Sequence, residues 1–329
     1  MKVFALAAGV VLISSSLSAQ QDGAQAQPPA VPTFRSASAL VALNVTVQDR
    51  GARFVRDLQP ADFVVYEDGV KQDVQFFEST RVPVDLIVLI DTSRSMRDKL
   101  GTVHEAAAEF LKTLRPGDRG AVVSFANTVS VLQPLTSDQA LLEQAVRSTE
   151  PNGSTCLNNA VYIALKQFGQ AARQGGEVRR QAVVVLSDGA DTASVVSFDD
   201  VIGLARRLGV SIYTVSLQSV QQAKQQEIMG RRAGMEEADI TMKALAKETG
   251  AQSFFPSPTG LKAVYASIAS ELASQYSIGY VPVNGQADGT FRRVNVQVVT
   301  RPDLRSRTRL GYTADGTRRP AALGAGGGR

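Results

Sequence analysis

Five oxygen-bearing side chains in three polar stretches could together hold a metal ion. They are Asp91, Ser93, Ser95, Thr155 and Asp188. The first three follow an apolar run in VDLIVLIDTSRSM, the threonine lies in PNGSTCLNNA, and the last aspartate ends the apolar run of VVVLSDGAD. Carboxylate and hydroxyl oxygens are the ligands that hard cations such as Mg²⁺ prefer. The sequence therefore predicts a site for Mg²⁺, or for Ca²⁺ or Mn²⁺, if the fold brings the three stretches together.

This donor set also indicates what a bound ion could do. Two carboxylates neutralise a divalent cation if both bind it directly, whereas the ion stays electron-poor if they act through water and hydroxyls fill the inner shell. An electron-poor ion attracts a carboxylate from another molecule. Asp-x-Ser-x-Ser alone has a second interpretation as the capped start of a helix, since Asp and Ser are good N-caps.

The apolar runs alternate with amphipathic helices between residues 82 and 276. We expect strands in VDLIVLID, GAVVSFA, QAVVVLSD, VSIYTVSL and AQSFFP, and helices near residues 100–114, 139–148, 157–171, 198–208, 242–249 and 260–274. Continuous apolar strands between helices are typical of a doubly wound, mostly parallel α/β sheet that is covered on both faces. Such sheets bind ligands outside the carboxyl ends of their strands, where the three polar stretches fall.

Two β-rich segments flank this α/β domain. Residues 36–81 contain the alternating run ALVALNVTVQD and a hairpin signal at Asp68-Gly69, and residues 277–314 contain the alternating run FRRVNVQVVT. Each segment is too short for a core of its own, so we expect them to pair into one small antiparallel β-sandwich that carries the α/β domain as an insertion. In LRSRTRLGY, three alternating arginines could bind nucleic acid or acidic lipid, but an exported location favours a solvated strand face. They are Arg305, Arg307 and Arg309.

The N-terminus is typical of a secretory signal peptide. Lys2 precedes an apolar core that is shorter than the roughly 20 residues needed to span a bilayer, and small residues follow it. We expect residues 1–19 to be removed, residues 20–35 to form a flexible leader and residues 315–329 to form a disordered tail. The mature protein would be periplasmic or secreted, with no transmembrane segment.

The three polar stretches resemble the pieces of the metal-ion-dependent adhesion site of von Willebrand factor A domains, and this similarity covers about residues 84–275. Asp91, Ser93 and Ser95 match the Asp-x-Ser-x-Ser loop, Thr155 matches the threonine of the second loop, and Asp188 matches the aspartate of the third. The resemblance implies that a carboxylate of the ligand completes the shell of the ion. The flanks resemble those of exported bacterial proteins of this type.

The expected function is therefore metal-dependent binding of a partner protein through one of its acidic side chains. Arg94 and Arg97 add positive charge beside the site and favour acidic ligands. We expect the charged segment 218–239 to influence access of the partner. The net charge of +4 is too small to suggest a nucleic-acid partner, and the sequence predicts no oligomeric state. The alternatives are a metal-independent structural protein of the cell envelope and, less favoured, a Mg²⁺-dependent hydrolase.

Catalysis lacks the usual side chains, so we do not expect an enzyme. The single histidine, His104, leaves no base for a Ser-His-Asp hydrolase and excludes a histidine-rich zinc site. A P-loop motif is absent, and an aspartyl phosphatase of the haloacid dehalogenase type would need an aspartate at Ser93. We interpret His104 as a surface or half-buried helix residue. Cys156, the only cysteine, is interpreted as a buried small residue because no histidine is adjacent to activate it.

Overall fold

The computed structural model describes residues 40–79, 82–171, 179–188, 191–217 and 237–314. The expected signal peptide, leader and tail lie outside the described residues, as do positions 218–236 of the charged segment. Within the described ranges, none of the helices combines the length and apolar character that a bilayer crossing requires.

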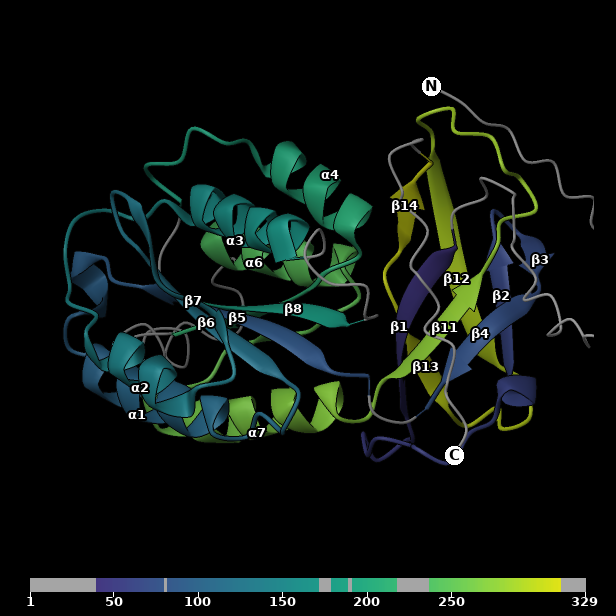
Figure 1. Ribbon diagram of the computed structural model, residues 1–329, viewed down its shortest axis with the longest axis horizontal. Helices are drawn as coiled ribbons and strands as arrows, with labels where there is room; N and C mark the ends of the chain where they lie inside the picture. The colour runs from purple at the N-terminus through teal and green to yellow at the C-terminus, as the bar shows by residue number, and fades with distance from the viewer. Residues whose placement is uncertain (1–39, 80–81, 172–178, 189–190, 218–236, 315–329) are drawn as a thin grey trace, which may run out of the picture. The chain divides into compact units, whose positions relative to one another are not determined.

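A six-stranded sheet forms the centre of the α/β domain (Figure 1). In spatial order its strands are β10 (Ser253–Phe254), β9 (Ser211–Ser216), β8 (Arg180–Ser187), β5 (Val84–Asp91), β6 (Arg119–Phe125) and β7 (Val129–Thr136). Neighbouring strands are parallel except β6 and β7, which are antiparallel. The expected mostly parallel sheet is confirmed, and its carboxyl-terminal edge is where the polar stretches lie.

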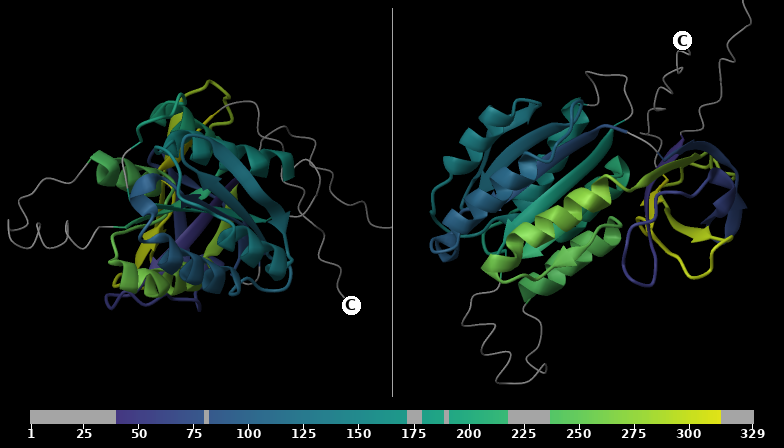
Figure 2. Two further views of the ribbon diagram at one scale, coloured as in Figure 1. Left: turned by 90° about the vertical axis from the view of Figure 1, so that its left-hand side faces the viewer. Right: turned by 90° about the horizontal axis from the view of Figure 1, so that it is seen from below.

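Helices cover both faces of this sheet, as Figures 1 and 2 show. One face carries α1 (Leu100–Leu111), α2 (Gln139–Arg147) and α7 (Leu261–Leu272). The other carries α3 (Leu157–Ala171), α4 (Phe198–Leu208) and α6 (Glu237–Glu248). The doubly wound arrangement follows from the apolar character of the strands, because a sheet that is apolar on both faces must be covered on both.

Strand β5 lies at the centre of the sheet and is buried along its whole length. Leu86, Val88 and Ile90 face the core under α1 and α7, whereas Ile87 and Leu89 face the core under α3 and α4. Alternate residues of a strand point to opposite faces, so a fully apolar run is the expected pattern here. A polar residue that ends this strand emerges between two helical layers.

The flanking segments form two four-stranded sheets. One contains β13 (Arg305–Arg307), β1 (Val41–Gln48), β11 (Tyr276–Tyr280) and β4 (Val74–Glu78). The other contains β14 (Gly311–Thr313), β12 (Phe291–Val298), β2 (Phe63–Glu67) and β3 (Val70–Gln72). Strands from both flanks pair antiparallel in each sheet, and their apolar side chains share one core, so the expected β-sandwich is confirmed.

Two strands differ from the sequence expectation. The Asp68-Gly69 hairpin is present, with φ of 48° and 85°, but the second run divides near Asp73, so that β3 stays with β2 while β4 pairs with β11 in the other sheet. Strand β7 has no counterpart among the expected strands. Its residues are half-buried or exposed, and it contains Pro134, which an edge strand tolerates because one side needs no N–H donor.

The expectation of a solvated arginine face on β13 is wrong for two of the three arginines. Arg305 is exposed. Arg307 donates to the carbonyl of Gly250, and Arg309 is 7% exposed and donates to the carbonyls of Arg206 and Ala42. Arg307 on the strand and Arg309 two residues after it thus bond to main-chain carbonyl groups of the α/β domain and of β1, which fixes them in place of a solvated face.

Glu271, near the end of α7, connects the α/β domain to the sandwich through one buried oxygen. The side chain is 1% exposed, and its Oε1 accepts hydrogen bonds from the hydroxyls of Thr46 (3.1 Å) and Tyr213 (2.8 Å). The same oxygen lies 2.7 Å from Nη2 of Arg307. A buried charge requires such partners because it has lost its hydration.

Glu271→Ala should therefore destabilise the protein by about 3 kcal/mol, because it leaves two buried hydroxyls and the half-buried Arg307 without their acceptor. Urea unfolding followed by circular dichroism measures the change. The control is Glu109→Ala, which removes an exposed ion pair with Lys262 and should leave the unfolding curve unchanged. Equal effects of the two substitutions would contradict the structural role of Glu271.

Candidate metal site

Backbone hydrogen bonds bring the three polar stretches together at the carboxyl end of β5. In the first stretch, the N–H of Arg94 donates to the carbonyl of Gly153 in the second. The N–H of Thr192, directly after the third stretch, donates to the carbonyl of Thr155 at 2.9 Å. The second stretch thus lies between the other two and bonds to both.

Asp91 is the most deeply buried of the predicted ligands, with 0% exposure. Its Oδ1 accepts from the N–H of Ser93 (2.7 Å), and its Oδ2 accepts from the hydroxyl of Ser187 (2.5 Å). Burial raises the pKa of Asp91, the nearby negative charge of Asp188 adds to this effect, and the two hydrogen bonds oppose it. No ion pair to Asp91 is found among the described residues. This buried carboxylate therefore lacks the cation that usually accompanies one.

The serines of the first stretch connect Asp91 to Asp188. The hydroxyls of Ser93 and Ser95 are 3.0 Å apart, and the Ser95 hydroxyl donates to Oδ1 of Asp188 at 2.7 Å. Ser93 precedes a short 3₁₀ helix, Arg94–Met96, yet its side chain makes no capping hydrogen bond to that helix. The N-cap interpretation of Asp-x-Ser-x-Ser therefore does not account for these hydroxyls, which are directed at each other and at the second carboxylate.

Lys99 is a site residue that the sequence analysis missed. Its Nζ lies 2.5 Å from Oδ2 of Asp188 and also donates to the carbonyl of Leu217 at 3.2 Å. The Lys99 side chain is 13% exposed and that of Asp188 is 2% exposed, so this ion pair is largely shielded from water. Lys99 thus gives Asp188 a positive partner inside the protein, whereas Asp91 has no such partner among the described residues. No sequence signal indicates this pair, because its members lie 89 positions apart.

Thr155 is 5% exposed and lies two residues before α3. Within the described part of the chain, its hydroxyl makes no hydrogen bond, while its N–H and carbonyl both bond to Thr192. Gly153 allows the turn before it, with φ of 72°. The structure thus holds the backbone of Thr155 firmly and gives its side-chain oxygen no partner among the described residues.

Two further residues organise the third stretch. Asp191 accepts hydrogen bonds from the N–H groups of Asn158 (2.8 Å) and Ser194 (3.0 Å). The side-chain oxygen of Asn159 accepts from the N–H groups of Val195 (3.2 Å) and Val196 (3.0 Å). The Asn158-Asn159 pair thus ties the start of α3 to the third stretch. An aspartate whose side chain bonds to backbone N–H groups two or three positions later is a common turn signal, which could have indicated the role of Asp191.

The arrangement fits a hard divalent cation. The described residues contain no group of three or more His, Cys, Asp and Glu side chains, so any metal held here depends on hydroxyl oxygens as well as carboxylates. The buried, cation-free carboxylate of Asp91 and the unpartnered hydroxyl of Thr155 are such oxygen donors. Arg94 and Arg97 are exposed beside the site.

The two residues considered for catalysis lie in structural positions. His104 is half-buried on α1, and its Nε2 lies 2.6 Å from the hydroxyl of Thr149. Burial and the charge of Arg147 lower the pKa of His104. Cys156 has no exposed surface, and burial raises its pKa, which opposes formation of a reactive thiolate. Both interpretations made from the sequence are confirmed.

Comparisons with known proteins identify relatives of this chain. A family model described as von Willebrand factor type A domain matches residues 86–190. The UPF0353 protein of Mycobacterium leprae (strain Br4923) is 30% identical over 253 residues, which cover 72% of this chain and 72% of that protein. The UPF0353 protein of Mycobacterium tuberculosis (strain H37Rv) is 28% identical over 248 residues, covering 70% of each. A solved von Willebrand factor type A structure from Catenulispora acidiphila aligns with a TM-score of 0.48 and 17% identity, covering 72% of this chain and 51% of that one.

Gly153→Ala should destabilise the protein by about 2 kcal/mol, because alanine is strained at positive φ and its Cβ would lie 2.6 Å from the Asn127 side chain. Gly169→Ala on α3 is the matched control. A Cβ there meets no atom within 4 Å, and alanine favours helix, so this change should stabilise. Denaturant unfolding of both variants checks the signs, and a neutral Gly153→Ala would contradict the described turn.

Proposed function

The chain belongs to the von Willebrand factor type A domain family, and on that premise we propose that it is a metal-ion-dependent protein-binding module. Asp91, Ser93, Ser95, Thr155 and Asp188 would hold a divalent cation, with Mg²⁺ the first candidate and Ca²⁺ or Mn²⁺ the others. When bound, the ion supplies an electron-poor point of attachment for a carboxylate of the partner. The buried, cation-free carboxylate of Asp91 is the observation that supports this most directly.

The residues around the site have separate tasks in this proposal. Ser93 and Ser95 place their hydroxyls between the two carboxylates, and the exposed Ser95 lies closest to an incoming ligand. The exposed arginines Arg94 and Arg97 attract an acidic partner and repel a basic one. The partner would be a protein that presents an Asp or Glu side chain, met in the periplasm or outside the cell, as the N-terminal sequence indicates.

Binding is favoured over catalysis because, among the described residues, neither the single histidine nor the single thiol is placed beside the site as a general base or nucleophile. The single histidine is half-buried against Thr149, and the single thiol is buried with a raised pKa. A hydrolase would need one of these groups, or an activated water, close to the carboxylates.

One observation favours the alternative of a metal-independent scaffold. Lys99 already neutralises Asp188, so the site could be a closed structural network that needs no added ion. The two functions differ in their response to chelation, since only the metal-dependent module loses its partner in EDTA.

Magnesium should raise the free energy of unfolding of the wild-type chain by about 2.7 kcal/mol when its concentration is 100 times the dissociation constant. Thr155→Ala should reduce this gain, because it removes a donor oxygen. The control is Ser154→Ala, at an exposed neighbour in the same stretch. Thermal unfolding with Mg²⁺ and with EDTA measures the effect.

The same variants then test partner capture from an envelope extract. Wild type and Ser154→Ala should retain a partner in Mg²⁺ and lose it in EDTA, whereas Asp91→Ala should capture nothing in either buffer. Capture that persists in EDTA would favour the scaffold instead.

Lys99→Met should increase magnesium affinity about tenfold, a change of about 1.4 kcal/mol, because it removes a positive charge that competes for Asp188. Isothermal titration calorimetry measures the dissociation constant. Lys112→Met is a suitable control, since this lysine directly follows the end of α1 and pairs with Glu143 on α2. Weaker magnesium binding by Lys99→Met would mean that the lysine positions Asp188 for the ion and does not compete with it.

A further inference from the structure

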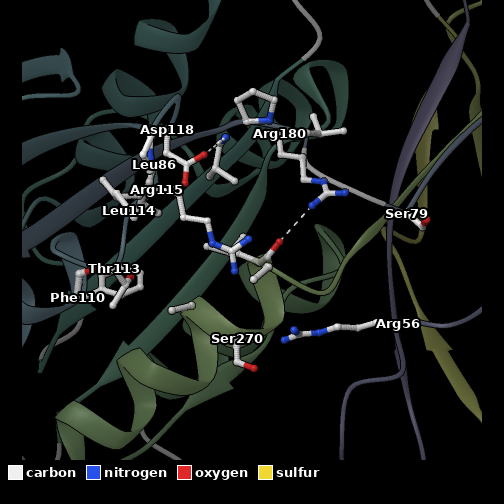
Figure 3. Close-up of a pocket in the computed structure, with 17 residues that line it drawn as sticks. Arg56, Ser79, Leu86, Phe110, Thr113, Leu114, Arg115, Asp118, Arg180 and Ser270 are labelled. Atoms are coloured by element: carbon white, nitrogen blue, oxygen red, sulfur yellow. Dashed lines mark hydrogen bonds between the residues drawn. The ribbon is translucent and has the colours of Figure 1, made fainter.

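A pocket lies at the opposite end of β5 from Asp91. It is a cavity of about 320 Å³ that begins at Val84 and Leu86, the first residues of the strand (Figure 3). Seven residues at 3.3 Å each separate Val84 from Asp91, a distance of about 23 Å. The volume is within the range of small-molecule sites, roughly 300–1,000 Å³. The pocket is therefore a separate candidate site.

Arg180, at the start of β8, is the buried charge of this pocket. It is 5% exposed, and it donates only to neutral acceptors: the hydroxyl of Ser277 (3.1 Å) and the carbonyls of Leu272 (3.2 Å) and Gln275 (2.7 Å). Burial lowers its pKa to about 10, and the negative charge of Glu78, outside ion-pair distance, partly opposes this. No ion pair to Arg180 is found in the described part of the chain. A guanidinium has five N–H donors, so two remain for a ligand.

Two more arginines reach the same space from the surface. In Figure 3, Arg115 extends toward Arg180 from the loop after α1, and Arg56 approaches from the sandwich side. Nε of Arg56 donates to the hydroxyl of Ser274 at 2.7 Å, which leaves its two terminal amino groups. The Arg115 side chain makes no hydrogen bond within the described residues. Both side chains are exposed and can adjust to a ligand.

One carboxylate, that of Asp118, lines the pocket, and both of its oxygens already accept hydrogen bonds. Both oxygens of Asp118 accept backbone hydrogen bonds, one from Val84 (2.8 Å) and one from Arg115 (2.9 Å). The pocket thus contains three arginines and one carboxylate whose oxygens already accept backbone hydrogen bonds, so its net charge is positive.

The remaining wall is partly apolar and includes the polar residues Ser79, Thr113 and Ser270. Its accessible apolar surface comes from the half-buried Val82, Pro83 and Leu114, because Leu86 and Phe110 are buried. A purely inorganic anion would leave this surface without contact, whereas an apolar chain would cover it. The guanidinium groups suit a carboxylate or a phosphate, since both accept paired N–H bonds.

We propose that this pocket binds a small amphiphilic anion: a carboxylate or phosphate head held by Arg180, Arg115 and Arg56, with a short apolar body against Val82, Pro83 and Leu114. Binding there is independent of the metal site. It does not rest on the proposed function, and the two can fail separately.

The test uses the full chain in EDTA, so that the metal site cannot contribute. Calorimetric titration with octanoate and with octyl phosphate should each give a measurable dissociation constant. Their neutral analogue 1-octanol, and inorganic phosphate alone, should bind at least tenfold more weakly. The tighter of the two charged ligands identifies the head group that the arginines prefer.

Variants locate the binding. Arg115→Gln and Arg56→Gln should each weaken octanoate or octyl phosphate about tenfold, because each removes one charge-assisted contact. Arg305→Gln, at an exposed arginine of β13, is the matched control and should bind as wild type does. Arg180→Gln is a less useful variant, because it also removes three structural hydrogen bonds and could prevent folding.

Two results would overturn the proposal. Octanol binding as tightly as octanoate and octyl phosphate would show that the arginines do not recognise the head group. Wild-type affinity in the double variant Arg56→Gln and Arg115→Gln would show that binding occurs elsewhere.

Discussion

The complete burial of β5 is the constraint on which both ends of the α/β domain depend. A strand covered on both faces can carry a charged residue only near its ends, and β5 has one carboxylate near each. Asp85, at 1% exposure, forms ion pairs with Arg119 (2.7 Å) and Arg179 (2.8 Å). Asp91 is equally buried, yet among the described residues it receives only a hydroxyl and an N–H group. Two similar carboxylates on one strand thus differ in their partners: Asp85 has two cations, and Asp91 has only neutral donors in the described ranges. This difference is the basis for the proposal that Asp91 helps to hold a cation that the chain itself does not supply.

The charge at the proposed metal site depends on how far Lys99 neutralises the carboxylates of Asp91 and Asp188. Two carboxylates alone would bind a divalent ion tightly and neutralise it. Lys99 neutralises part of the negative charge of Asp188, so an ion bound as proposed would keep some of its positive charge for a ligand. The same lysine gives the site a stable arrangement without metal, because Asp188 stays paired in either state. Under the proposed function, such a site would bind its ion less strongly and, once loaded, would attract an acidic partner more strongly.

The sequence was sufficient for features set by local pattern and insufficient for those set by distant contacts. The apolar runs locate the strand ends, and parallel topology brings these ends to one edge, so the grouping of Asp91 and Asp188 could be expected. The pairing of Lys99 with Asp188 and of Glu271 with Arg307 could not, since nothing local distinguishes these lysine and arginine residues from solvated ones. The alternation of the β13 arginines was recognised, but which face is buried depends on the α/β domain beside it. Strand β7 was missed because its half-exposed residues lack a continuous apolar run.

The contacts of α7 bear on whether ligand binding could move this helix. Arg180 bonds to the carbonyl of Leu272 at its end, and the buried Glu271 contacts residues of β1, β9 and β13. Translation by one helical turn, about 5.4 Å, would separate Glu271 from these partners. Breaking a buried ion pair in this way costs roughly 3–5 kcal/mol, more than a ligand of moderate affinity readily supplies. The helix also continues within four residues into β11, so its end is fixed by the sandwich sheet as well. The structure therefore favours a fixed position for α7, and in the proposed function selectivity would be set by the charges around Asp91 and not by displacement of this helix.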